Sequence, residues 1–531
     1  MRSRGDSCMD LFLIDAIGPF FRGHQRQTIN WSKIPWEHIE LDDPQRKEAQ
    51  FRQIRSDFDL FCQKVSSIGF NAITLDDLAH VADHPYYEES VRRRIKACRE
   101  EFDHLFEIAT AHGLAVYLTI DVVSYTPQLR EEIGTRGARV REFLGDLIDA
   151  FFDSCPAVRG LIVRVGESDG KDVRGDFRSE LHLRSAGMVR RFLKHTLPVF
   201  ERHGRRLIFR TWTVGAHSVG DLIWHRSRFH EAFGEIDSGA FVISMKYGES
   251  DFFRFLPLNA NFFRSDHAKI VELQARREYE GCGEFPAFIG SDCERFARAL
   301  EKAPNMVGVS VWCQTGGWVP FRRLAFLEPE AGSGPAIWNE INAAVALRIF
   351  KHRERVPQAL AFAAESFGIR DADSLLELLE GSESAICGLL YIREFAEQKL
   401  FFRRVRIPPL LSIYWNNIFI NHSTRKLMRH FVRDPERAIR EAREVLGRMD
   451  RMHDLAERCG LPSEDIEFMR DTFRLLALAR DYYFLPYSDE IRRQIKKEKR
   501  TYKKRWPKRI RQRYRIKVDY QPFHLRRRHL G

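Results

Sequence analysis

Eight short apolar runs recur between residues 11 and 312, and they constrain the fold more than any other feature of this 531-residue chain. The runs are rich in β-branched residues, and segments with the 3.6-residue period of helices separate most of them. The runs cover residues 11–14, 72–75, 115–120, 160–165, 206–210, 241–245, 269–273 and 307–312. The main helical segments between them cover residues 50–68, 88–112, 139–152, 181–203 and 293–302.

This alternation predicts an α/β fold, a (β/α)8 TIM-type barrel over residues 1–327. An open, doubly wound sheet is the alternative, but no G-x-G-x-x-G pattern follows the first run. The segment EPEAGSGP at residues 328–335 predicts a linker. Helical spacing then dominates residues 336–490, so we expect a mostly helical C-terminal domain, as the length of the chain also indicates.

Residues 491–531 form a basic tail. They contain 18 Lys and Arg against two acids, a net charge of +16, so the other 490 residues carry −4. Aromatic and apolar residues (Tyr502, Trp506, Tyr514 and Ile516) are mixed with the cations. The tail is either a partly helical extension that packs these side chains on the body, or an arm that binds a polyanion such as nucleic acid, lipid head groups or an acidic glycan.

The nine cysteines are scattered, odd in number and never in C-x-x-C spacing, which favours reduced thiols over disulfides or a zinc site. No apolar stretch approaches the length of a membrane span, and we expect residues 11–14 to form a core strand rather than part of a signal peptide. A cytoplasmic location is therefore expected. The oligomeric state stays open, with a homodimer among the alternatives.

Acidic residues follow several of the predicted strands. In a parallel barrel the carboxyl ends of all strands meet at one mouth, where catalytic groups lie. Each acid alone is more often structural than catalytic, but several at one mouth favour catalysis, because two facing carboxyl groups can divide into a general acid and a base. The acids that follow strands are Asp76, Asp77, Asp121, Glu167, Asp169, Asp251 and Glu278.

Cations and aromatic residues are expected at the same mouth. Arg164, Arg210 and Lys246 lie in or just after apolar runs. They either form ion pairs with nearby acids or together bind an anionic group of a substrate, for which Arg is well suited. The aromatic residues belong to the core or stack against a sugar. They are Trp212, Tyr247, Phe252, Trp312 and Trp318.

Two segments give the middle of the chain a resemblance to the alpha-glucuronidases of glycoside hydrolase family 67. Residues 246–252, KYGESDF, are similar to that family's Lys-Asn-Gly-x-x-Asp-Phe element, and residues 277–281, REYEG, are similar to its Gln-Glu-Tyr-Leu-Gly element. The resemblance implies that Lys246 binds the uronic acid and that Asp251 and Glu278 are the carboxylates on the base side. It also implies that Arg210 contacts the uronate carboxylate.

The fourth run departs from the family pattern. Arg164 takes the place of a lysine, and Gly-Glu-Ser-Asp-Gly at residues 166–170 stands where the family has Asp-Ser-Glu-Gly. The general acid is therefore either Glu167 or Asp169, and Glu167 is favoured for its reach. The chain begins almost directly with the first run, so we expect no counterpart of the family's N-terminal β-sandwich domain.

The sequence thus predicts an inverting glycoside hydrolase that acts on a uronic-acid-containing or other acidic oligosaccharide. The catalytic residues would be Glu167, Asp251 and Glu278. The substrate-binding residues would be Arg164, Asp169, Arg210, Trp212, Lys246 and Tyr247. No metal or other cofactor is expected, because metal-ligand spacing is absent from the sequence. The alternatives are a non-catalytic barrel that binds an acidic polysaccharide or other polyanion, and a polysaccharide lyase or glycosyl transferase.

Overall fold

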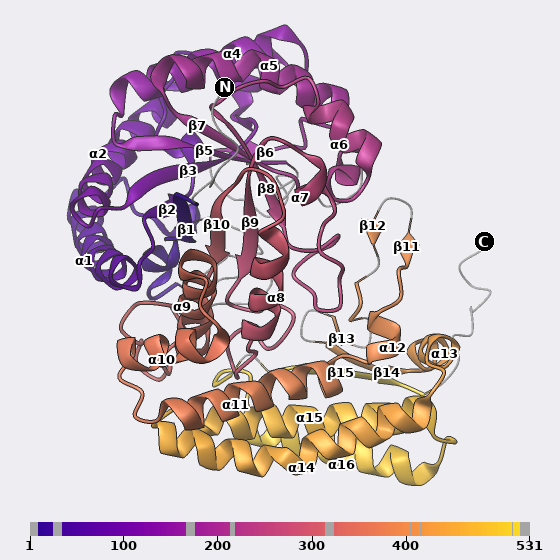
Figure 1. The fold of residues 1–531 in the computed structure, drawn as a ribbon. Helices are drawn as coiled ribbons and strands as arrows, with labels where there is room; N and C mark the ends of the chain where they lie inside the picture. The colour runs from indigo at the N-terminus through magenta and orange to yellow at the C-terminus, as the bar shows by residue number, and fades with distance from the viewer. Residues whose placement is uncertain are drawn as a thin grey trace, which may run out of the picture.

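A computed structural model describes residues 9–24, 34–165, 176–212, 218–313 and 323–402, together with residues 405–406, 408–410, 413–414, 417–511 and 513–520. Its main feature is a closed barrel of eight parallel strands in the order β1-β10-β9-β8-β7-β5-β3-β2 (Figure 1). The predicted (β/α)8 barrel is therefore confirmed. The strands are β1 (Leu11–Asp15), β2 (Ala72–Leu75), β3 (Ala115–Asp121), β5 (Val158–Arg164), β7 (Arg206–Arg210), β8 (Phe241–Lys246), β9 (Ala268–Gln274) and β10 (Met306–Trp312).

Helices cover the outside of the barrel, and local sequence signals fix where they begin and end. In α1 (Pro44–Ile68), the Asp43 side chain accepts from two backbone N–H groups of the first turn, and Gly69 ends the helix with φ of 112°. The other helices of this part are α2 (Glu89–Ala111), α3 (Pro127–Ile133), α4 (Ala138–Ser154), α5 (Ala186–His203), α6 (Arg226–Phe233), α7 (Asn261–Arg264) and α8 (Gly290–Leu300). A two-stranded sheet of β4 (Ser124–Tyr125) and β6 (Arg178–Ser179) lies outside the barrel.

The first helix after the predicted linker still packs on the barrel. This helix, α9 (Ile337–His352), contacts both α8 and β10. It therefore occupies the place of the outer helix that follows the eighth strand of a (β/α)8 barrel. Its buried face is broad, because it packs on the barrel on one side and on α10 (Val356–Ser366) on the other.

The C-terminal region is mostly helical, as predicted. Long antiparallel helices pack side by side below the barrel in Figure 1. The helices are α11 (Ala372–Ala385), which continues into a π-helical turn (Ile386–Leu390), α12 (Arg393–Ala396), α13 (His422–Phe431), α14 (Pro435–Cys459), α15 (Ser463–Phe484) and α16 (Asp489–Arg505). Short strands, which helical spacing did not predict, form two small sheets from β11 (Phe401–Phe402), β12 (Val405–Arg406), β13 (Ile413–Tyr414), β14 (Asn417–Asn421) and β15 (Arg515–Asp519).

The described part of the basic tail is folded onto the helical region. Helix α16 packs on α15, and β15 pairs in parallel with β14. Tyr502, Trp506 and Tyr514 are buried, which agrees with the first of the two interpretations of the tail. Arg511 is buried as well. It donates to Asp465 on α15 (2.6 Å) and to the Glu284 carbonyl of the barrel (2.8 Å), so it fixes the tail to both parts.

Asp465 is the centre of this connection. It is fully buried and accepts from Arg323 through both oxygens (2.6 and 2.7 Å) and from the Trp338 indole (2.7 Å). Arg323 follows β10 and Trp338 lies on α9, so one carboxylate joins barrel, helical region and tail. Burial alone would raise the pKa of Asp465, but the two guanidinium groups hold it below its usual value.

Two further findings concern the described residues as a set. Their eight cysteines are all free thiols. None of their helices combines the length and the apolar character that a membrane span needs.

Candidate active site

The strands of the barrel change character towards their carboxyl ends. Successive residues of a strand point to opposite sides, so every second residue faces the barrel interior. The lower interior is an apolar cluster that includes Ile162, Ile208 and Ile270. Two residues further on, the same alternation places Arg164, Arg210 and Glu272 at the interior of the mouth. A charged layer therefore lies on top of an apolar core.

Arg210 forms a buried ion pair with Glu272 on β9. Its Nε and Nη2 atoms donate to the two carboxylate oxygens at 2.9 and 2.8 Å, and both side chains are at most 4% exposed. The Ser244 hydroxyl adds a third hydrogen bond to Glu272 (2.6 Å). Burial alone would raise the pKa of Glu272, but Arg210 and Lys246 outweigh it and keep the pKa below its usual value. The Trp312 ring covers the Arg210 guanidinium at 4.6 Å.

Arg164 occupies a similar position at the end of the neighbouring strand β5. Its guanidinium lies 3.1 Å from Asp121 and 3.4 Å from Asp76, and all three side chains are buried. The Thr119 hydroxyl donates to Asp76. Arg164 and Arg210 thus both form ion pairs with acids of the barrel interior. A ligand that met either guanidinium would also meet its acidic partner.

Asp251 lies on the loop after β8 and is held by three donors. Lys246 Nζ and the Phe252 N–H donate to Oδ1 (2.7 and 2.9 Å), and the Tyr279 hydroxyl donates to Oδ2 (2.7 Å). The ammonium group of Lys246 also lies 3.7 Å from the Trp212 ring centre. The Asp251 side chain keeps 14% of its surface exposed, more than Lys246 does at 6%.

Glu278 lies on the next loop, after β9, and experiences the charge of Asp251. Its Oε2 accepts from Gln274 (3.1 Å) and lies 3.2 Å from Arg276, while its side chain stays 12% exposed. Burial raises the pKa of Glu278 above its usual value. Attraction to Arg276 opposes this rise, and repulsion from Asp251 adds to it. The two loops therefore bring together two carboxyl groups with different surroundings, one paired with a lysine and one whose pKa is raised.

The structure brings together five of the predicted site residues, and Tyr247 is not among them. Arg210, Trp212, Lys246, Asp251 and Glu278 are linked by the contacts above. The Tyr247 ring stacks on Phe296 (4.7 Å between centres) and its hydroxyl donates to the Phe253 carbonyl (3.0 Å), so it belongs to the core. Glu167, Asp169 and Trp318 lie outside the described residues.

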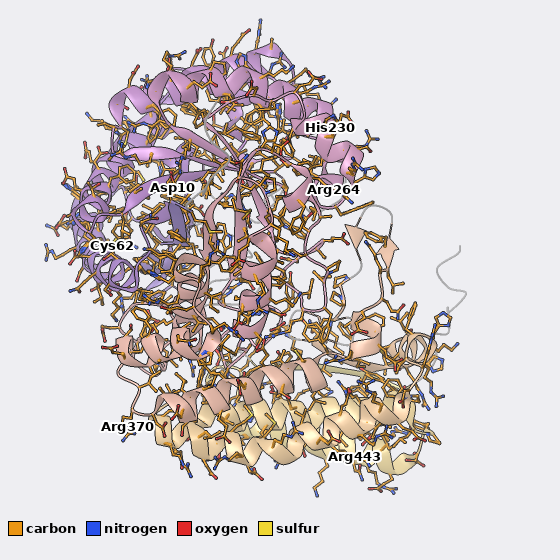
Figure 2. All side chains as sticks on the ribbon, in the orientation of Figure 1. Asp10, Cys62, His230, Arg264, Arg370 and Arg443 are labelled. Carbon is orange, nitrogen blue, oxygen red and sulfur yellow. The ribbon has the colours of Figure 1, made fainter. Side chains whose placement is uncertain are left out.

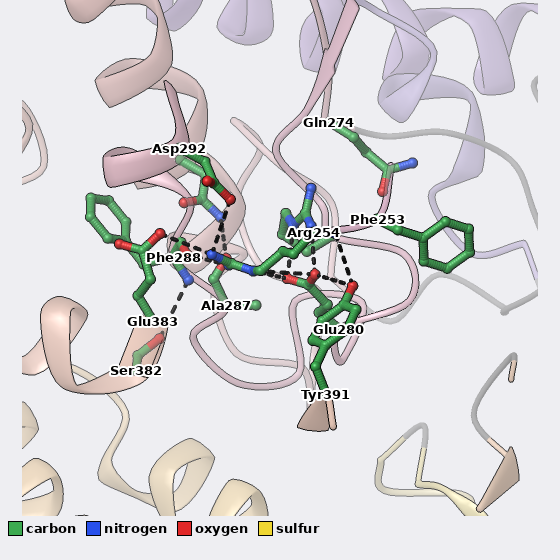
Figure 3. Close-up of polar contacts among 12 residues, drawn as sticks. Phe253, Arg254, Gln274, Glu280, Ala287, Phe288, Asp292, Ser382, Glu383 and Tyr391 are labelled. Atoms are coloured by element: carbon green, nitrogen blue, oxygen red, sulfur yellow. Dashed lines mark hydrogen bonds and ion pairs between the residues drawn. The ribbon is translucent and has the colours of Figure 1, made fainter. Parts of the chain in front are cut away.

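A buried network of polar contacts connects both loops to each other (Figure 3). Glu280, two residues after Glu278, accepts from Arg277 (2.6 and 3.0 Å), from Arg254 (3.2 Å) and from the Tyr391 hydroxyl (2.7 Å). Arg254, three residues after Asp251, also donates to Glu383 of α11 (2.9 Å). We call these five residues the Arg254–Glu280 network. It ties the two loops that carry Asp251 and Glu278 to the helical region.

Sequence reasoning missed Glu272, Arg276 and Tyr279 as members of the site. Glu272 stands inside an apolar run, and its inward alternation with Ile270 was the signal that could have found it. Tyr279 links the two loops directly, because its hydroxyl bonds to Asp251 and its ring stacks on Phe253 at 4.3 Å. No group of three or more His, Cys, Asp and Glu in the described ranges is arranged to hold a metal ion.

Comparison with known proteins shows the fold. No protein-family model matches the chain, and no curated protein matches it. A GH138 enzyme targeting pectin rhamnogalacturonan II superposes with a TM-score of 0.57 at 11% identity, over 94% of this chain and 62% of that enzyme. This chain therefore spans less than two-thirds of the length of that enzyme.

Two further structures superpose less well. A GH5_18 enzyme from Streptomyces cattleya in complex with GlcNAc has a TM-score of 0.39 at 13% identity, over 66% of this chain and 82% of that one. A beta-mannanase from the blue mussel Mytilus edulis has a TM-score of 0.37 at 13% identity, over 66% and 94%. None of the three is an alpha-glucuronidase, so the family 67 resemblance stays a prediction. What the comparison with the GH138 enzyme shows is a shared barrel fold.

Proposed function

We propose that this protein is a glycoside hydrolase acting on a uronic-acid-containing or other acidic glycan, as alpha-glucuronidases do. The observation that carries the proposal is the pairing of Asp251 and Glu278 at the barrel mouth, one beside Lys246 and the other with a raised pKa. Two carboxyl groups in different surroundings can supply the acid and the base that hydrolysis of a glycosidic bond needs. The shared fold with an enzyme targeting pectin, an acidic glycan, supports it.

The cations at the mouth favour an anionic substrate. Lys246 lies 2.7 Å from Asp251, and Arg276 lies 3.2 Å from Glu278. A uronate group bound beside these two carboxyl groups would therefore be within reach of both cations. Arg276 is a guanidinium, which suits bidentate binding of a carboxylate. We assign substrate contact to these two. Arg164 and Arg210 would instead hold the inner acids in place, and Trp212 and Trp312 would shape the sugar-binding surface.

For the mechanism we propose single-displacement, inverting hydrolysis, as the sequence predicts. Glu167 would protonate the leaving oxygen, and Asp251 would take a proton from the attacking water, whose oxygen forms the new bond to the anomeric carbon. Because its pKa is raised, Glu278 is protonated more readily than an ordinary glutamate, so we assign it the role of orienting the water. In the other assignment, Glu278 is the acid and Asp251 the nucleophile, and that reaction retains the anomeric configuration.

The experiment is a screen of the purified protein against uronic-acid-containing oligosaccharides, with the anomer of the released sugar followed by NMR. Asp251→Asn, Glu278→Gln and Glu167→Gln are assayed in parallel, and Glu249→Gln, on the same loop as Asp251, serves as the control. We expect the first two substitutions to abolish release and the control to keep it. A product of inverted configuration, whose release is lost in Glu167→Gln, supports the inverting mechanism with Glu167 as the acid. A product that keeps the anomeric configuration of the substrate supports Glu278 as the acid.

Two alternatives are decided by the same screen. If the acidic oligosaccharides bind but none is cleaved, the barrel is a non-catalytic binding protein. An unsaturated product, detected by its ultraviolet absorbance, identifies a lyase, and transfer of the sugar to a second glycan identifies a transferase. Each of these results contradicts the hydrolase proposal.

A further inference from the structure

Helix α16 carries a row of cations on its solvent face. Ile491, Ile495 and Tyr502 are buried against the helical region. Arg493, Lys497, Arg500 and Lys504 are all exposed and follow the spacing i, i+4, i+7, i+11. This spacing places them in one stripe opposite the buried side chains, about one helical turn of ~5.4 Å apart. Figure 1 shows α16 on the side of the helical region away from the barrel.

Acids of the described chain offset little of this charge. Arg493 pairs with Glu490 (2.7 Å). The ion pairs among the described residues include none for Arg492, Lys496, Lys497, Arg500, Lys503 or Lys504. By contrast, four exposed cations of helix α14, which also packs on α15, each have an acid within 4.0 Å; they are Arg437, Arg440, Arg443 and Arg451.

Like charges on α16 stand at the spacing where they repel. Lys496 and Arg500, and likewise Arg500 and Lys504, are four residues apart, which destabilises a helix when both carry the same charge. The pKa of Lys499 is lowered by partial burial and, in addition, by Lys503. The fold thus retains a repulsion that an anionic partner would relieve.

An aromatic surface adjoins the row at its N-terminal end. Tyr487 is 45% exposed, and its ring centre lies 6.0 Å from that of Tyr520. The guanidinium of Arg492 lies over the Tyr520 ring at 5.8 Å. Aromatic rings beside a guanidinium can stack on a sugar face while the cation meets its carboxylate.

We propose that the solvent face of α16, with Tyr487 and Tyr520, binds an extended acidic polysaccharide. Uronic-acid polymers carry one carboxylate on each acidic sugar, so their charges recur along a line, as the cations of α16 do. An anionic membrane fits less well, because the apolar face of α16 is buried in the protein and cannot enter a bilayer. The choice of a polysaccharide over nucleic acid rests on the proposed function.

The test measures binding of polygalacturonate to the full chain carrying Asp251→Asn, which prevents turnover. We compare it with the same chain in which Lys496, Lys497, Arg500 and Lys504 are changed to Gln. The matched control changes Arg437, Arg440, Arg443 and Arg451 to Gln on α14 and so removes the same net charge. Arg443 is 69% exposed on the outside of the helical region (Figure 2).

We expect the α16 variant to bind at least tenfold more weakly and with a shallower salt dependence, and the α14 control to bind within twofold of the parent. Thermal unfolding of the α16 variant should be unchanged or higher, since repulsion is removed. Equal weakening by both variants, or tighter binding of single-stranded DNA or of anionic vesicles than of polygalacturonate, overturns the proposal. Cleavage of short oligosaccharides by the wild type, assayed separately, tests the hydrolase proposal independently.

Discussion

Arg210 and Glu272 illustrate how much of the mouth depends on single buried charges. Each is almost fully buried, and each is the main partner of the other. Removing one partner of a buried pair leaves an uncompensated charge, which is far more harmful than removing both.

We therefore expect Glu272→Gln to lower the free energy of unfolding by about 3–5 kcal/mol, and Arg210→Met with Glu272→Leu to lower it by less. Urea denaturation followed by circular dichroism measures both. Equal losses in the single and double variants would show that the pair does not act as a unit.

Glu340 on α9 gives a pH dependence that can be measured. Burial raises the pKa of Glu340 to about 7, although the Phe326 N–H donates to it at 2.7 Å. A carboxyl whose pKa is higher in the folded than in the unfolded protein favours folding when protonated, and this contribution is lost as pH rises from ~4.5 to about 7.

Glu340→Gln should therefore reduce the loss of stability between pH 5 and pH 8, by up to about 3 kcal/mol relative to wild type. Denaturation curves at the two pH values, with Glu365→Gln as a control on neighbouring α10, measure the difference. Parallel pH dependence in wild type and Glu340→Gln would contradict the assignment.

At the scale of single residues, the sequence indicated which loops carry the candidate site residues, but it did not indicate which side chains these residues contact. Asp251, Glu278 and Lys246 follow strands and carry recognisable spacing, so they could be found. Tyr247 follows a strand in the same way but packs in the core, because strand position alone does not say which way a loop side chain turns. Glu272 was missed because its partner, Arg210, lies 62 residues away.

At the scale of elements, the eight strands and most outer helices followed from periodicity. The two-residue strands β4, β6 and β11 to β13 did not, because they are too short to show alternation. The Arg254–Glu280 network was also invisible in the sequence. Its members come from two barrel loops and from the end of α11, and only the fold brings them together.

Tyr391 is the member of this network whose removal is most informative. Its hydroxyl donates to Glu280 (2.7 Å) and accepts from the Arg254 N–H (3.2 Å), so Tyr391→Phe leaves two buried groups short of a partner. We expect a loss of about 1–3 kcal/mol in unfolding free energy. If the protein is the proposed hydrolase, we also expect kcat on a cleaved glycan to fall while KM changes little, because the two loops that carry Asp251 and Glu278 lose support.

Tyr483→Phe is the matched control for this prediction. The Tyr483 hydroxyl donates to the Phe419 carbonyl, within the helical region. This variant should lose stability without a selective loss of kcat. The same kinetic change in both variants would mean that the network only stabilises the fold.

At the scale of the whole molecule, barrel, helical region and tail are joined at Asp465. Asp465→Asn would remove the acid that binds Arg323 through both oxygens and one of three acids near the buried Arg511, and we expect it to lower the free energy of unfolding by about 3–5 kcal/mol. Asp450→Asn is the control, since Asp450 is 81% exposed in its pair with Arg470 and should change stability by less than about 1 kcal/mol. Thermal unfolding with limited proteolysis measures both effects, and equal stability of the two variants would contradict the prediction.

The position of Arg511 has a consequence for how the protein is made. Asp465 meets Arg323 from an earlier part of the chain, but Arg511 comes 46 residues after it. During translation the barrel strands leave the ribosome before Arg511 does. The contact of Arg511 with the buried Asp465 can therefore form only after almost the whole chain has been made. A nascent chain interrupted between residues 465 and 511 would keep the pair of Asp465 with Arg323 but would lack the contacts of Arg511 with Asp465 and with the Glu284 carbonyl. We therefore expect proteases to cleave such a chain more readily than the full-length protein.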